Sequence, residues 1–124
     1  MAALREIVFD CAQPAPLARF WAAVLDGYAV RAYDDAERAR LAARGLTPET
    51  DPVVMVDGPG PILCFQLARE PRAENGRIHL DVSIADRAAE VARLCALGAQ
   101  VLREGDGYTV LRDPEGNAFC VAQR

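Results

Sequence analysis

An internal repeat constrains the fold of this chain more than any other feature of its sequence. Two triplets share the same intervals, Asp57, Gly60 and Cys64 in the first half and Asp113, Gly116 and Cys120 in the second. Gly27 and Gly98, which are expected to end helices, fall in register with these triplets. A pattern that recurs in this way indicates two copies of one structural unit.

Each copy reads as a strand, a helix and three further strands, which is a βαβββ unit. Alternating apolar and polar residues predict the strands, and apolar residues at helical spacing predict the helices. The first half is expected to form strand 7–11, helix 17–25, strand 28–33, a short helix 35–44 and strands 53–56 and 62–67. The second half is expected to form strand 78–84, helix 87–97 and strands 101–103, 108–112 and 118–122. The predicted fold class is α+β, with one domain over 1–124 built from a first unit 4–68, a connection 69–77 and a second unit 78–124.

Composition excludes several classes of protein. The chain has 124 residues, of which 52% are hydrophobic, and this is enough to bury one core. Its net charge is −4 and its arginines are scattered, which argues against a nucleic-acid partner. No stretch approaches the roughly 18 apolar residues of a membrane span, so we expect a cytoplasmic protein. The four cysteines lack CxxC spacing and are expected to be free, buried thiols.

The strand predicted at 78–84 contains the only histidine of the chain. Its residues alternate, so that Leu80, Val82 and Ile84 are expected to pack beneath helices. The opposite side then carries His79, Asp81 and Ser83 together. These three polar side chains are the first candidates for a functional site.

Four segments resemble the vicinal oxygen chelate superfamily, in particular its glyoxalase-like and bleomycin-resistance-like proteins. They are residues 9–12 with 17–21, residues 64–66, residues 77–82 and residues 112–121, the last reading Arg-Asp-Pro-Glu-Gly-Asn-Ala-Phe-Cys-Val. The resemblance implies two βαβββ units whose sheets form one curved mixed sheet around a concave cavity, with helices outside. It also implies a small-molecule ligand and a homodimer.

Strand alternation assigns the residues that line this cavity. Apolar positions go beneath the helices, which leaves polar and small side chains inside. The candidate catalytic residues are His79, Asp81 and Glu6, as general acids or bases. The candidate ligand-binding residues are Asp10, Trp21, Cys64, Gln66, Ser83 and Cys120. The alternative for His79 is a structural role, in which it hydrogen-bonds Asp10 or Glu6; Phe20, beside Trp21, is expected in the core.

Metal-dependent members of the superfamily place one ligand on each of four strands. The matching positions here are Glu6, Cys64 (or Gln66 if the strand is shifted), His79 and Cys120. Only Glu6 and His79 are of the usual ligand type, so no metal cofactor is expected. A divalent ion such as Zn, Ni, Fe or Mn at these four positions is the less favoured alternative.

Two functional hypotheses follow. The first is an enzyme that binds a small organic carbonyl compound and catalyses a metal-independent isomerase or lyase reaction. The alternative is a non-catalytic protein that sequesters a drug or natural product, as the resistance branch does. A structural module with a cavity filled by side chains is a third and weaker hypothesis.

Overall fold

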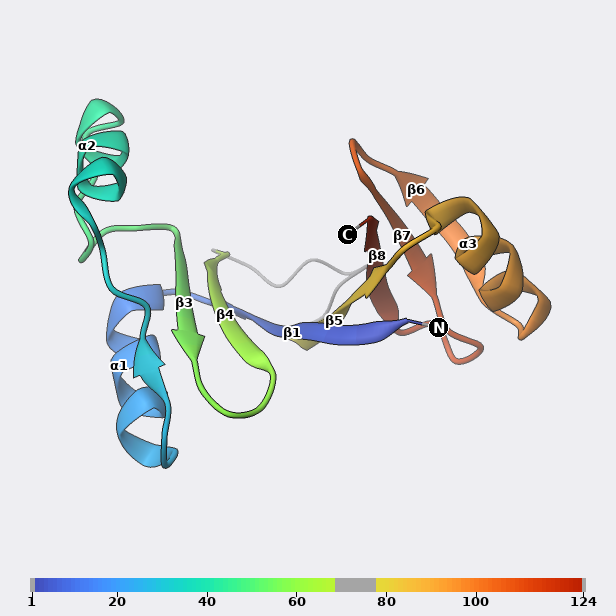
Figure 1. The fold of residues 1–124 in the computed structure, drawn as a ribbon, viewed down its shortest axis with the longest axis horizontal. Helices are drawn as coiled ribbons and strands as arrows, with labels where there is room; N and C mark the ends of the chain where they lie inside the picture. The colour runs from blue at the N-terminus through green and yellow to red at the C-terminus, as the bar shows by residue number, and fades with distance from the viewer. Residues whose placement is uncertain (1, 69–77, 124) are drawn as a thin grey trace. The chain divides into compact units, whose positions relative to one another are not determined.

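The computed structural model describes residues 2–68 and 78–123 (Figure 1). In chain order its elements are β1 (Ala3–Cys11), α1 (Pro14–Val24), β2 (Ala29–Val30), α2 (Asp35–Ala43), β3 (Val53–Asp57), β4 (Ile62–Leu67), β5 (Ile78–Ile84), α3 (Arg87–Ala96), β6 (Gln100–Glu104), β7 (Tyr108–Arg112) and β8 (Ala118–Gln123). They form two βαβββ repeats with α2 added to the first, which confirms the predicted α+β class. The predicted connection 69–77 lies outside the described residues.

The chain divides into two compact lobes, each of which is described by itself. The N-terminal lobe is Phe9–Glu70, and the C-terminal lobe combines Met1–Val8 with Pro71–Arg124. The strand order is β2-β3-β4-β1 in the N-terminal lobe and β1-β5-β8-β7-β6 in the C-terminal lobe, so β1 contributes to both. The single domain and the concave cavity stay predictions.

In the N-terminal lobe, α1 covers one side of the sheet. Pro14 and Pro16 lie in its first turn, where a missing N–H costs no helical hydrogen bond. Beneath the helix, Phe65 is fully buried and stacks on Phe9, with ring centroids 5.1 Å apart. Val54, the register partner of Phe65 on β3, is buried as well. This apolar side leaves the alternate residues of β1, β3 and β4 on the side away from α1.

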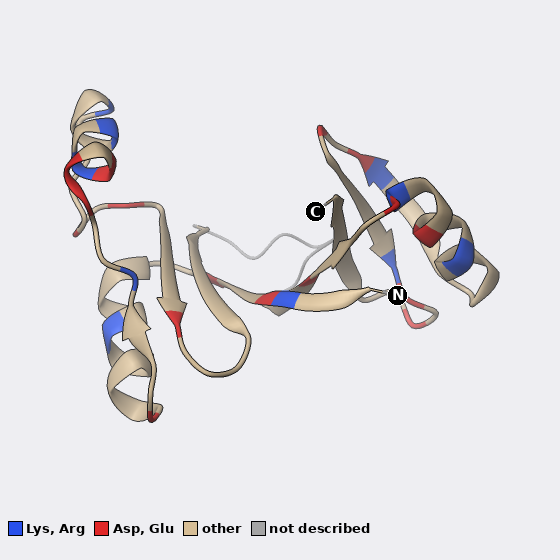
Figure 2. Cartoon of the chain, viewed as in Figure 1, with Lys and Arg blue, Asp and Glu red and all other residues tan. Residues whose placement is uncertain are grey.

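The helix α2 is polar, and its charges follow the helix dipole. Asp34 caps the helix by accepting a hydrogen bond of 2.8 Å from the backbone N–H of Glu37, and Arg40 lies in the last turn. Figure 2 shows acidic residues where α2 begins and basic residues further along it. Leu41 is the buried residue that attaches the helix to the lobe. The sequence predicted this helix correctly.

The strand predicted at 28–33 is shorter in the structure, where β2 contains Ala29 and Val30. After β2, the side chain of Tyr33 forms a hydrogen bond outside the sheet. Tyr33 donates a hydrogen bond of 2.8 Å to Asp51, which lies before β3 rather than on it. The backbone N–H of Arg31 still donates to the carbonyl oxygen of Met55 at 2.9 Å, one residue beyond β2.

In the C-terminal lobe, α3 packs against the sheet around a core of Ile84, Leu111 and Val121. Asp86 caps α3 as predicted, accepting a hydrogen bond of 3.1 Å from the backbone N–H of Ala89. The prediction that Leu80 also packs in this core is wrong, because Leu80 is 44% exposed. Ile84 belongs to this core and Val82 packs against it, as predicted.

The repeat is visible in matching contacts of two glycines. Gly27 and Gly98 both have positive φ, at +78° and +111°. A Cβ at Gly27 would lie 3.3 Å from the Pro59 ring, and a Cβ at Gly98 would lie 3.2 Å from the Pro114 ring. The chain just after the helix therefore lies against the same hairpin turn in both copies, and the predicted repeat is confirmed. Gly98 follows the C-cap of α3 as predicted, but α1 already ends at Val24 with Leu25 as its C-cap, so the prediction that Gly27 ends it is wrong.

All four cysteines are free, as predicted, but the prediction that they are buried is correct only for Cys64, and Cys95 is exposed. Within residues 2–68 and 78–123, no helix combines the length and apolar character that crossing a membrane requires.

Candidate functional site

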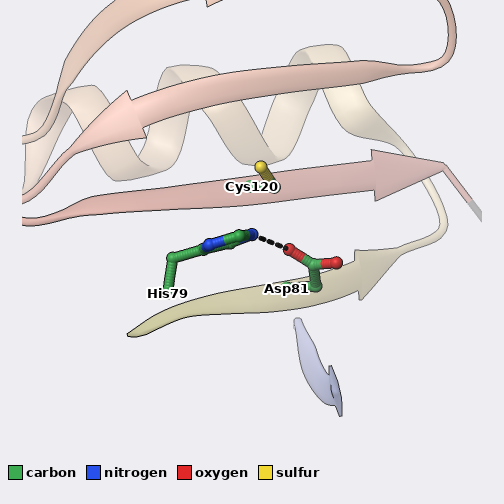
Figure 3. A group of neighbouring side chains, drawn as sticks. All are labelled: His79, Asp81 and Cys120. Carbon is green, nitrogen blue, oxygen red and sulfur yellow. Dashed lines mark ion pairs between the residues drawn. The ribbon is translucent and has the colours of Figure 1, made fainter. Parts of the chain in front are cut away.

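The polar side of β5 places His79 and Asp81 next to each other in the C-terminal lobe (Figure 3). Residues two apart on a strand point to the same side. The Nε2 atom of His79 lies 3.5 Å from Oδ1 of Asp81. The two residues are only 8% and 9% exposed. The prediction that these side chains lie together is therefore confirmed by their geometry.

The neighbouring strand β8 adds a thiol to this pair. β5 and β8 run parallel, and Asp81 is the register partner of Cys120. As a result, ligand atoms of His79, Asp81 and Cys120 all lie within 4.8 Å of one another (Figure 3). We call these three residues the His79 cluster.

The strand β1 contributes two charged residues beside the His79 cluster. Glu6 is buried, and Nη2 of Arg5 lies 3.1 Å from Oε1 of Glu6 and 3.6 Å from Oδ2 of Asp81. Sequence analysis missed Arg5. The signal that was available is that two buried carboxylates need a nearby cation, because an uncompensated buried charge is costly.

Burial changes the acidity of the cluster. Burial raises the pKa of Asp81 to about 7, and the hydrogen bond and charge of Glu6 add to this rise, while Arg5 opposes it. Burial, followed by the charge of Asp81, raises the pKa of the Cys120 thiol to about 11. The carboxyl group of Asp81 therefore holds its proton more tightly than an exposed aspartate does, and Cys120 is a thiol rather than a thiolate at neutral pH.

The donor set of the His79 cluster fits a divalent cation of borderline softness. An imidazole nitrogen, a carboxylate oxygen and a cysteine sulfur are the ligand types that zinc accepts. These three residues would hold such an ion, and the ion would supply Lewis acidity toward a carbonyl oxygen. Asp81 is in this set although it was absent from the predicted ligands.

The remaining predicted residues are divided between the lobes. In the C-terminal lobe, half-buried Ser83 follows Asp81 on the same side of β5 and pairs in register with Ala122. In the N-terminal lobe lie Asp10, Cys64 and Gln66, on the side of the sheet away from α1, and Trp21 on α1 itself. The predicted roles of these residues, and of Glu6, stay predictions.

Trp21 packs edge-to-face against Phe20, with ring centroids 5.3 Å apart. The expectation that Phe20 belongs to the core is wrong, since Phe20 is 56% exposed. Helical spacing identified a helix correctly but did not show which of its apolar residues the lobe covers.

The two βαβββ repeats are those of the vicinal oxygen chelate superfamily, which contains the glyoxalase, bleomycin resistance and dioxygenase proteins. A family model described as a glyoxalase-like domain matches residues 6–122. The chain belongs to this glyoxalase-like family.

Solved structures share the fold at low sequence identity. A hypothetical protein from Bacillus halodurans C-125 aligns with a TM-score of 0.66 and 10% identity, covering 99% of this chain and 94% of the other. A glyoxalase/bleomycin resistance protein/dioxygenase superfamily member from Vibrio splendidus 12B01 aligns with a TM-score of 0.57 and 15% identity, covering 98% and 100%. A methylmalonyl-CoA epimerase, solved in complex with methylmalonyl-CoA and NH4+, aligns with a TM-score of 0.50 and 18% identity, covering 99% and 94%. No curated protein matches the sequence.

Proposed function

We propose that the protein is an enzyme that binds a small organic carbonyl compound and transfers a proton on it without a metal ion. The observation that carries this proposal is the buried contact of 3.5 Å between His79 and Asp81. An imidazole and a carboxyl group held together out of water form a suitable general acid and base pair. The family supports the carbonyl class of substrate only by analogy of fold.

In the proposed reaction a C–H bond next to the carbonyl group breaks. His79 or Asp81 takes the proton, the electron pair moves into a C=C bond, and the carbonyl oxygen gains negative charge. The proton then returns to the same carbon or to its neighbour, which gives epimerisation or isomerisation. Arg5, on the other side of Asp81, keeps part of the negative charge of Glu6 and Asp81 neutralised during the cycle.

The similarity to a methylmalonyl-CoA epimerase agrees with this proposal. Inversion of a carbon centre beside a carbonyl group needs removal and return of one proton. The likeness is one of fold alone, so the test below uses several substrate classes rather than that thioester only.

The test is hydrogen exchange into candidate substrates in D2O, followed by NMR. The candidates are α-hydroxy ketones, aldehydes and α-methyl acyl thioesters. Deuterium incorporation is expected for one class, and His79→Gln is expected to lower its rate about 10²-fold or more, the usual contribution of a general base. Asp106→Asn, a change at an exposed residue of the same lobe, is the matched control and should leave the rate unchanged.

Cys120→Ala and treatment with a chelator separate proton transfer by side chains from metal chemistry. If hydrogen exchange persists in Cys120→Ala and after chelator treatment, the result agrees with the proposal. If both treatments abolish exchange, the reaction needs a metal ion and the metal-free part of the proposal is wrong. Saturable binding of a compound without any exchange would instead favour the sequestering protein.

A further inference from the structure

We infer that the N-terminal lobe binds the carboxylate group of a small organic acid in a cavity formed by α2 and β3, where Arg44 recognises the negative charge. The site uses no residue of the C-terminal lobe. It is therefore independent of the proposed function, and either can fail without the other.

The cavity is built by a segment that only the first repeat contains. In the first repeat α2 and its flanking loops separate β2 from β3, whereas in the second repeat residues 105–107 alone connect β6 to β7. The cavity has a volume of about 380 Å³ and is lined by residues 31–34, by one face of α2, by residues 51–53 and by Met55. This volume lies within the range of small-molecule sites, about 300 to 1,000 Å³.

The segment that forms the cavity is fixed to the lobe at three points. Tyr33 precedes the cap of α2 and Asp51 precedes β3, and the hydrogen bond of 2.8 Å between their side chains joins the two ends of the segment. Between these ends, the fully buried Leu41 attaches α2 to the lobe. The walls of the cavity are thus in place before a ligand binds, which lowers the cost of ordering them.

The cavity is accessible from solvent. Many of its lining residues are exposed, among them Arg44 and Val53, and the side chain of Arg40 is 51% exposed. A ligand can therefore reach these side chains without any opening of the lobe.

The carboxylates that line the cavity already have donors. The two oxygens of Asp51 accept hydrogen bonds from the Tyr33 hydroxyl at 2.8 Å and from the backbone N–H of Val53 at 3.0 Å. Glu37 accepts a hydrogen bond from its ion-pair partner on α2, and Asp34 accepts one as the cap of α2. The acids of the lining are therefore occupied by groups of the lobe itself.

The arginines of the lining retain unused donors. Asp57 binds Arg31 through two N–H groups, at 2.8 and 2.7 Å. Arg40 donates one hydrogen bond of 2.9 Å to Glu37, and the side chain of Arg44 forms no hydrogen bond or ion pair with any residue that the structure describes. A guanidinium group has five N–H donors, so Arg40 and Arg44 present donors to the cavity that only a ligand or water can use.

The spacing of these two arginines suits a carboxylate. Residues four apart lie on one face of a helix, with Cβ atoms about 5 to 6 Å apart, and both Arg40 and Arg44 line the cavity. A guanidinium binds a carboxylate through two parallel hydrogen bonds. Three arginines and three acids line the cavity, so it offers no excess of positive charge for a dianion such as phosphate.

The strand side of the cavity is apolar. Val53 and Met55 alternate with Val54 and Val56, which are buried, and they line the cavity together with Pro52. The body of the ligand should therefore be apolar. Phenylacetate is a suitable probe, and phenylacetamide is its neutral counterpart of the same shape.

The experiment is a titration of the 15N-labelled full chain with each probe, read from amide chemical shifts. We expect saturable shifts in α2 and β3 with phenylacetate and at least tenfold weaker binding of phenylacetamide. Arg44→Gln should weaken binding of phenylacetate about tenfold. Arg38→Gln is the matched control, because Arg38 is an exposed arginine of the same helix that does not line the cavity, and it should alter binding less than twofold.

Three results would overturn the inference. One is the absence of saturable shifts with phenylacetate, and the second is equal affinity for phenylacetamide. The third is an Arg44→Gln variant that binds as well as Arg38→Gln does. His79→Gln should leave binding of phenylacetate unchanged, and a loss of binding in that variant would instead assign the probe to the His79 cluster and contradict the inference.

Discussion

Replacing Asp81 by Asn should make the protein more stable at alkaline pH than the natural chain is. Burial and Glu6 raise the pKa of Asp81 to about 7 in the folded protein, whereas the unfolded chain has an ordinary value near 3.8. Between these two values the folded state binds more protons than the unfolded state. The contribution of Asp81 to stability is thus complete at low pH and is lost as pH rises toward 7.

The size of this effect follows from the two pKa values. One pKa unit corresponds to about 1.4 kcal/mol, and part of the loss has already occurred at pH 5. Between pH 5 and pH 8 the free energy of unfolding of the natural chain should fall by about 2 to 3 kcal/mol through Asp81 alone. Asp81→Asn, which has no charge at either pH, should lack this fall.

Urea unfolding followed by circular dichroism at pH 5 and pH 8 measures the effect. The quantity to compare is the unfolding free energy of Asp81→Asn minus that of the natural chain. This difference should be larger at pH 8 than at pH 5. Asp106→Asn controls for the loss of one exposed carboxylate. The comparison is repeated with both proteins also carrying His79→Gln, so that titration of the imidazole does not contribute to the difference between pH 5 and pH 8. A difference that is equal at both pH values, or that moves against the variant, would refute the reasoning.

Further predictions concern stability, metal content and assembly. Ile84→Ala should cost about 2 to 5 kcal/mol because it opens a hole in the core, whereas His79→Ala should cost only about 1 kcal/mol; equal losses of melting temperature would show that His79 is structural. Gly98→Ala should cost about 1 to 2 kcal/mol because of its φ of +111° and the nearby Pro114 ring, and an unchanged melting temperature would contradict this. Elemental analysis after gentle purification should find no stoichiometric metal; close to one zinc, nickel, iron or manganese per chain would reverse that expectation. Sedimentation at micromolar concentration should give a homodimer, because an edge strand such as β6 invites pairing; a monomer mass would count against it.

The order of the elements could be read from the sequence because it depends on local preferences. Gly98 ends a helix through a backbone conformation that glycine adopts easily, and Asp86 begins the same helix by capping it. Period-two alternation likewise placed His79 and Asp81 on one side of a strand. Each of these signals depends on residues that are close together in the sequence. The repeat presents the same signals twice along the chain.

The chemistry of the His79 cluster was decided by tertiary structure. Cys120 lies beside Asp81 because β5 and β8 pair in one parallel register, and Arg5 on β1 contacts both its neighbour Glu6 and Asp81 on β5. The raised pKa of Asp81 needs burial and a second carboxylate at once. Such effects depend on long-range packing and on distances of a few ångströms, which alternation along a single strand does not specify. The exposure of Leu80 has the same origin, since the pattern marks a side chain as apolar but only packing determines whether anything covers it.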